Sequence, residues 1–101
     1  PGSLGSGPVL TTSGAGIRMI WYNRKAAFRA GLVNGTEWDD VNIGTGSTAF
    51  GTNNTASGGF SFAAGGSNNL VSSNNGFVAG TGNITQGADQ TVIGRYNVCS
   101  G

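Results

Sequence analysis

The stretch STAFG at residues 47–51 decides the fold, because variants of it return three more times along the chain. The later copies are SFAAG at 61–65, GFVAG at 76–80 and QTVIG at 90–94. The glycines that close the four copies follow one another at nearly equal spacing, and they are Gly51, Gly65, Gly80 and Gly94. A short and regular period of this kind indicates a repeat architecture, in which each unit stacks on the next one.

Each copy alternates between two side-chain faces, as a β-strand does. A second element follows each copy, and Thr55, Leu70, Ile84 and Val98 hold equivalent places in it. Glycine and asparagine fill the positions between elements, and both accept the left-handed backbone angles of tight turns. The pattern predicts an all-β fold, a parallel β-solenoid of about four 14-residue coils that bury their apolar surface by stacking. A disordered, asparagine-rich segment is the alternative, and the phased apolar positions argue against it.

The alternation also predicts which residues face inward. We assign the larger residues to the core of the roll, because large and small side chains compensate one another between layers. The expected core consists of Phe50, Phe62, Leu70, Phe77, Ile84, Ile93 and Val98. The opposite face of the first element carries small residues that allow another chain to approach, and open strand edges favour such pairing. The expected interface between chains consists of Ala49, Ala63, Val78 and Val92.

Composition limits the classes of protein to which this chain can belong. It has 101 residues, 20 glycines and a net charge of +1, with 9% charged residues. This profile suits neither a helical bundle nor a highly charged disordered tail. A charge so near zero gives no reason to expect nucleic acid as a partner. No apolar run approaches the ~20 residues of a membrane helix, so we expect no direct membrane insertion.

Three segments follow from this reading. Residues 1–15 form a leader rich in glycine and serine, expected to be flexible, and its first three residues PGS resemble a scar of tag removal. Residues 16–41 are expected to form an N-terminal β capping module, and residues 42–101 the roll. Solenoids need such caps, because their terminal coils otherwise expose apolar surface and strand edges.

The capping module concentrates cationic and aromatic side chains, which allows two interpretations. In the first, a β-hairpin covers the first coil, and its Lys and Arg residues pair with the acids that follow in TEWDD, residues 36–40. In the second, a basic and aromatic patch binds a glycan or another receptor. The candidate contacts for that ligand are Trp21, Tyr22, Arg24 and Trp38. The near balance of opposite charges favours the cap.

The repeats also resemble a known family. The stretch NIGTGSTAFGTNNTASGGFSFAAGG, residues 42–66, is similar to the head repeats of trimeric autotransporter adhesins, which read S-x-A-x-G followed by N-x-A-S-G. Residues 16–44 resemble a module that precedes such heads, although Asn23 stands where that module usually has proline. TVIGRYNV at 91–98 is similar to the last coil of heads that precede self-cleaving chaperone domains in phage tail fibres. The resemblance implies a left-handed parallel β-roll and a homotrimer.

The sequence offers no recognisable catalytic or metal-binding constellation. It contains no histidine, and Asp39 and Asp40 are adjacent, so in a strand they would point to opposite faces. Cys99 aligns with Ala56, Val71 and Thr85, which favours a packed side chain over a nucleophile. We therefore expect no enzyme, no cofactor and no metal.

The expected function is that of a trimeric head segment of a surface adhesin or virion fibre. Such a segment lies outside the cell, on a bacterial or virion surface, and serves for display and for attachment to a host receptor or other surface. The alternative function is a specific glycan- or receptor-binding module that uses the N-terminal aromatic and basic cluster.

Overall fold

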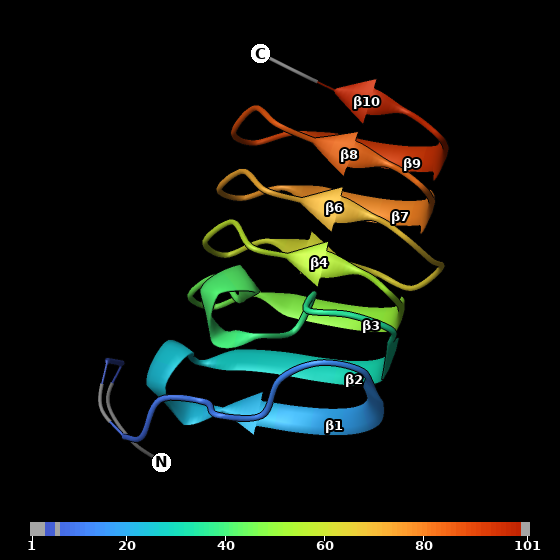
Figure 1. The fold of residues 1–101 in the computed structure, drawn as a ribbon. Coiled ribbons are helices and arrows are strands. Elements are labelled where there is room, and N and C mark those ends of the chain that lie inside the picture. Colours follow the sequence, from blue (N-terminus) through green and yellow to red (C-terminus); the bar gives the residue numbers. More distant parts are fainter. Residues whose placement is uncertain (1–3, 6, 100–101) are drawn as a thin grey trace.

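The fold is an elongated stack of coils that begins with a hairpin (Figure 1). The computed structural model describes residues 4–5 and 7–99. The strands and 3-10 turns are β1 (Gly16–Tyr22), η1 (Asn23–Lys25), β2 (Ala27–Val33), η2 (Asp40–Asn42), β3 (Thr48–Thr52), β4 (Thr55–Ala56), β5 (Phe62–Ala63), β6 (Leu70–Val71), β7 (Phe77–Thr81), β8 (Ile84–Thr85), β9 (Thr91–Arg95) and β10 (Val98–Cys99).

Two sheets face each other across the stack. The six-stranded sheet has the order β1-β2-β3-β5-β7-β9, and the four-stranded sheet has the order β10-β8-β6-β4. Every pairing between successive coils is parallel, and Phe62 of β5 lies beside Phe77 of β7. The four-stranded sheet pairs Thr55 with Leu70, Leu70 with Ile84 and Ile84 with Val98. The parallel β-solenoid of about four coils, and the alignment of its second element, are therefore confirmed.

The N-terminal module is the expected hairpin. β1 and β2 pair in antiparallel fashion over seven residues each, from Gly16 opposite Val33 to Tyr22 opposite Ala27. The turn uses η1 and then Ala26, whose φ of 51° is left-handed. β2 then pairs in parallel with β3, with Arg29 beside Ala49. The hairpin thus covers the first edge of the solenoid, and β1 takes the edge position in its place.

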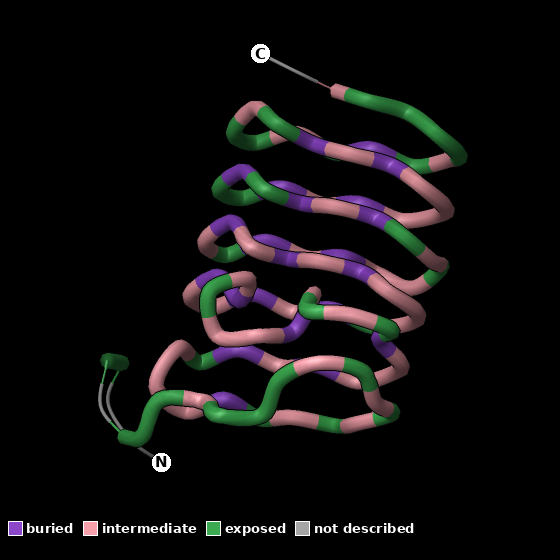
Figure 2. Tube along the Cα trace, in the orientation of Figure 1, coloured by how far each residue is buried: buried purple, intermediate pink, exposed green. Residues whose placement is uncertain are grey.

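The core between the two sheets is narrow and consists of small side chains. It is formed by Ala49, Ala56, Ala63, Val71, Val78 and Val92, with the partly buried Cys99 packed against it. Figure 2 shows buried positions flanked by half-buried or exposed ones along the coils between β3 and β9. The position predicted for Cys99 as a packed side chain is confirmed.

The predicted assignment of faces is wrong. The four residues assigned to a contact between chains, Ala49, Ala63, Val78 and Val92, lie in the core of the single chain. The residues assigned to the core, Phe50, Phe62, Leu70, Phe77, Ile84, Ile93 and Val98, are half-buried or exposed. The physical reason is width, because two strands joined by short turns leave too little space between the sheets for a phenyl ring in each coil. Alternation separates two faces, and side-chain size then decides which face fits inside.

A ladder of buried asparagines runs along one corner of the stack. The backbone N–H groups of Asn69, Asn83 and Asn97 each donate to the side-chain oxygen of the asparagine one coil earlier, at 2.9–3.0 Å. The side-chain amide of Asn69 also donates to the carbonyls of Gly65 and Gly80. Asn54, Asn69 and Asn83 are buried, so this ladder satisfies backbone groups that water cannot reach.

Candidate functional site at the N-terminal cap

The cap contains a pocket between the leader and the end of β1. It has a volume of about 360 Å³ and is lined by Pro8, Val9, Leu10, Thr11, Trp21, Tyr22 and Asn23. The Trp21 side chain is 61% exposed, because the alternation along β1 directs it outward together with Ile17 and Met19. The pocket therefore offers an indole ring, aliphatic carbon and peptide groups, and carries no charged side chain among its lining residues.

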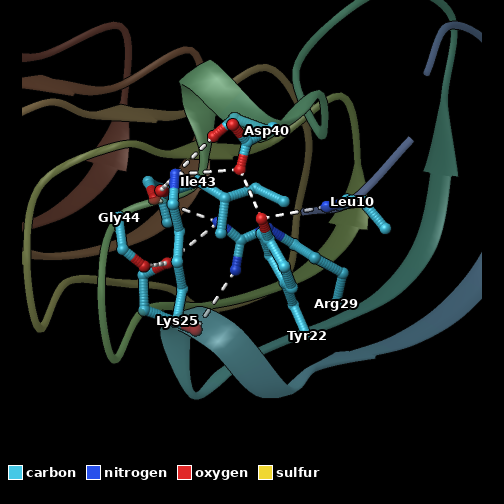
Figure 3. Close-up of polar contacts among 9 residues, drawn as sticks. Leu10, Tyr22, Lys25, Arg29, Asp40, Ile43 and Gly44 are labelled. Atoms are coloured by element: carbon cyan, nitrogen blue, oxygen red, sulfur yellow. Dashed lines mark hydrogen bonds and ion pairs between the residues drawn. The ribbon is translucent and has the colours of Figure 1, made fainter. Parts of the chain in front are cut away.

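Tyr22 lines this pocket and also belongs to a polar network, which Figure 3 shows. Its hydroxyl donates to Oδ1 of Asp40 at 2.6 Å and accepts from the N–H of Leu10 at 3.0 Å. Burial raises the pKa of Tyr22, and the hydrogen bond to Asp40 raises it further. The same bond lowers the pKa of Asp40, since it stabilises the carboxylate more than partial burial destabilises it.

Lys25 completes the network from the turn between the two strands of the hairpin. Its Nζ lies 3.3 Å from Oδ1 of Asp40 and donates to the carbonyls of Asp40 at 2.6 Å and Ile43 at 2.9 Å. These contacts join the hairpin to η2, which leads into the first coil. The predicted pairing of a cap cation with an acid of the TEWDD segment is confirmed by this pair.

Arg29 is the second unusual feature of the cap and is fully buried. Its guanidinium donates to the carbonyls of Phe28, Ser47 and Ala56 and to the hydroxyl of Ser47, at 2.9–3.2 Å. Its Nε has no partner among the described residues, and no carboxylate pairs with it there. Burial lowers the pKa of Arg29 to about 10, which leaves the guanidinium charged at neutral pH.

The four predicted ligand contacts do not form one site. Trp21 and Tyr22 line the pocket, but Tyr22 is nearly buried and its hydroxyl is already bonded. Arg24 donates to the carbonyl of Gly7 at 2.8 Å and does not line the pocket. Trp38 is buried with 1% of its surface exposed, and its indole N–H donates to the carbonyl of Asn54 at 3.0 Å. The assignment of Trp38 as a surface contact is therefore wrong, because its side chain is buried and its indole N–H is bonded within the chain.

The described part of the leader is held by hydrogen bonds to the cap. The N–H of Gly14 donates to Oδ1 of Asp39, and Arg18 donates to the carbonyls of Ser13, Gly14 and Ala15. Residues 1–3 of the leader, with position 6, and residues 100–101 of the roll lie outside the described residues.

No protein-family model matches this chain, and no curated protein or solved structure is significantly similar to it. The two described helices are three-residue 3-10 turns, and neither is long enough to cross a membrane.

The polar side chains of the cap are bonded to one another and to backbone carbonyls. Among residues 4–5 and 7–99, no three His, Cys, Asp or Glu side chains lie close enough to hold a metal ion. The ionisable groups of the network are engaged with one another, and their shared effect is to join the hairpin to the roll. The ring of Trp21, beside the pocket, is exposed to solvent.

Proposed function

We propose that this chain is a non-enzymatic head segment of a trimeric surface adhesin or virion fibre. Its coils form a left-handed roll, three copies associate, and the assembly stands on a bacterial or virion surface. The observation that carries this proposal is the uninterrupted stack of parallel coils with an asparagine ladder along its corner. A solenoid of this kind makes a rigid rod, and its side chains repeat at a fixed height in every copy.

The proposed mechanism is display. A homotrimer repeats each weak contact with a receptor three times, and the effective concentration of the second and third contacts increases the overall affinity. This function needs no cofactor and no catalysed reaction. The resemblance of residues 42–66 to adhesin head repeats supports it.

Two measurements test this proposal. Light scattering at micromolar concentration should give three times the chain mass of 10.1 kDa. Fluorescently labelled protein should bind saturably to at least one of a panel of bacterial and animal cells. The absence of any saturable binding by a protein of trimeric mass would argue against attachment and leave a purely structural segment.

A second candidate function, a glycan- or receptor-binding module, is favoured by the exposed Trp21 beside the pocket. Sugar rings stack on aromatic faces of this kind, and most binding pockets combine apolar walls with a few polar groups. A glycan array should then give discrete signals that Trp21→Ala removes. Ile17→Ala is the matched control, since Ile17 is exposed on the same strand and does not line the pocket. Signals that survive Trp21→Ala would exclude this pocket as the site.

A further inference from the structure

The hairpin leaves one edge of the six-stranded sheet bare, and that edge belongs to β1. β1 is the first strand of the sheet, at the lower end of the stack in Figure 1, and it pairs with β2 alone. Phe28 of β2 donates its N–H to Ser47, so the peptide groups of Phe28 point toward β3. Because these groups alternate along a strand, those of Arg29 point toward β1. Its partner in β1, Ile20, is therefore bonded to β2.

Every second residue of β1 points its peptide groups away from the sheet. Ile17, Met19 and Trp21 alternate with the positions that bond to β2, so their N–H and C=O groups face the bare edge. Among residues 4–5 and 7–99, no group outside β2 bonds to the backbone of these three residues. A strand edge with unpaired donors and acceptors is a template on which another strand can pair.

The edge of β1 lacks the features that normally protect an edge strand, which are a charge, a proline or a bulge. Its outward side chains are apolar, and Ile17, Met19 and Trp21 are 80%, 78% and 61% exposed. Arg18 lies on the opposite face, where its guanidinium donates to three carbonyls of the leader. The edge strand at the other end of the sheet differs, because β9 carries the exposed charge of Arg95.

A second copy of β1 is complementary to this edge. In an antiparallel pairing centred on Met19, Met19 lies opposite Met19 of the second copy, and Ile17 lies opposite its Trp21. These pairs exchange two hydrogen bonds each, about six in total, and thus use every outward N–H and C=O of the three residues. An aromatic residue opposite a β-branched one also stabilises antiparallel pairing. Arg18 lies opposite Ile20, so no two like charges face each other directly.

We propose that β1 is an interaction surface through which two copies of this chain pair edge to edge, with their β1 strands antiparallel. The two-fold axis is perpendicular to the sheet at Met19, so the two six-stranded sheets become continuous and the two stacks meet cap to cap. The contact does not depend on the proposed function, since it can join two single chains or two trimers. Seven residues span only about 23 Å, so we expect a weak contact that depends on concentration.

Replacement of Met19 by proline tests the pairing through the mass of the assembly. Met19→Pro removes an N–H that points to the bare edge and spares the bonds between β1 and β2, and proline is tolerated at such edge positions. Met19→Val, which keeps the N–H, is the matched control. In sedimentation from micromolar to millimolar concentration, the wild type and Met19→Val should reach twice the mass of Met19→Pro. Far-ultraviolet circular dichroism shows whether each variant remains folded.

Disulfide cross-linking tests the register and does not depend on the proline variant. Met19→Cys and Ile17→Cys are each made in a Cys99→Ser background and incubated with oxidised glutathione. The pairing places the two copies of residue 19 about 5.5 Å apart between Cα atoms, within reach of a disulfide. The two copies of residue 17 are offset by about four residues, or about 13 Å, which is too far. A covalent dimer should therefore form for Met19→Cys and not for Ile17→Cys, although both positions are about equally exposed.

The outcomes separate this inference from the proposed function. A wild type with the mass of Met19→Pro at every concentration overturns the pairing, and a trimer that does not double leaves the proposed function intact. A monomer that doubles to a dimer supports the pairing and contradicts the trimer. Equal cross-linking at positions 17 and 19 overturns the antiparallel register. Assemblies that keep growing with concentration also overturn it, because they would show that the edge of β1 binds the other end of the next stack.

Discussion

Arg29 lies beside Ala49 in the parallel pairing of β2 with β3, so a cationic side chain occupies the place that small apolar residues hold in later coils. It fills the end of the core, where β2 of the hairpin lies next to Ala49 in place of a coil. Its guanidinium reaches the carbonyls of Ser47 and Ala56 across the opening. The hairpin therefore closes the solenoid with one long side chain as well as with a strand.

This position predicts that volume matters more than charge at residue 29. The carbonyls of Ser47 and Ala56 also accept backbone N–H groups from Phe28 and Gly44, so they keep a partner without the guanidinium. Arg29→Met should then change the free energy of unfolding by about 1 kcal/mol or less, since an apolar side chain of similar length replaces a costly buried charge. Arg29→Ala leaves a cavity and should cost about 3 kcal/mol.

Urea unfolding at one fixed protein concentration measures both Arg29 variants. An equal decrease in the free energy of unfolding for Arg29→Met and Arg29→Ala would show that the hydrogen bonds of Arg29, rather than its volume, stabilise the end of the core.

The correction of the inward and outward faces gives a second prediction. It compares the same substitution, valine to alanine, at a buried and at an exposed position. Val78 is fully buried between the sheets, whereas Val98 is 62% exposed on the four-stranded sheet. Val78→Ala removes two buried methyl-sized groups and should cost about 2 kcal/mol, with about 0.8 kcal/mol for each and a further cavity term. Val98→Ala should stay within about 0.5 kcal/mol. A larger decrease in the free energy of unfolding for Val98→Ala would support the assignment made from the sequence, with Val98 in the core.

The asparagine ladder predicts a strong contrast between neighbours in the sequence. Asn69→Ala removes the side-chain oxygen that accepts the N–H of Asn83 and the amide that donates to Gly65 and Gly80. A buried N–H without a partner costs about 1–3 kcal/mol, so we expect a loss of at least about 2 kcal/mol. Asn68→Gly is the control, because Asn68 is exposed and its φ of 57° suits glycine. Thermal unfolding should leave the control within about 0.5 kcal/mol of the wild type.

The contact between Tyr22 and Asp40 predicts a loss of stability in acid. The hydrogen bond from Tyr22 holds the pKa of Asp40 below its ordinary value of 3.8, and Lys25 adds to this effect. A carboxyl group with a lowered folded-state pKa contributes stability above its unfolded pKa, and that contribution disappears as the pH falls through the folded value. Asp40→Asn should therefore reduce the melting temperature at neutral pH and remove part of its decline in acid.

Melting temperatures measured between about pH 6 and about pH 2 test this linkage. The exposed residue Asp89 supplies the control, and Asp89→Asn should keep the acid decline that Asp40 causes. A wild-type decline in Asp40→Asn would assign the acid sensitivity to other carboxyl groups.

The repeat could be predicted from the sequence because stacking requires particular residues at the same position of every coil. The closing glycines are one example, since Gly80 has a φ of 121° and a Cβ there would collide with the carbonyl of Gly94. Side-chain alternation and turn residues fixed the strands and their register for the same reason. The inward face was harder to predict, because alternation separates two faces without showing which one is buried. Only the small size of Ala49, Ala56 and Ala63 indicated that their face lies inside.

The cap was harder to predict because it does not repeat. Trp38 and Trp21 have the same chemistry, yet Trp38 is buried and Trp21 is exposed. Arg29 resembled the other cations of its segment, and its burial depends on the parallel register with β3. These positions depend on contacts between segments that are distant in the sequence, such as Trp38 with Asn54, and no local pattern encodes such contacts.

The order of the coils along the chain predicts an order of folding. The hairpin pairs residues that are near in sequence, and each later coil joins its neighbour across one short repeat, as Thr55 joins Leu70 and Leu70 joins Ile84. No long loop has to close as the stack grows, so folding can start at the hairpin and advance one coil at a time. Amide hydrogens should accordingly exchange slowest in β2 and β3 and fastest in β9 and β10, where Ile93 and Val98 face solvent.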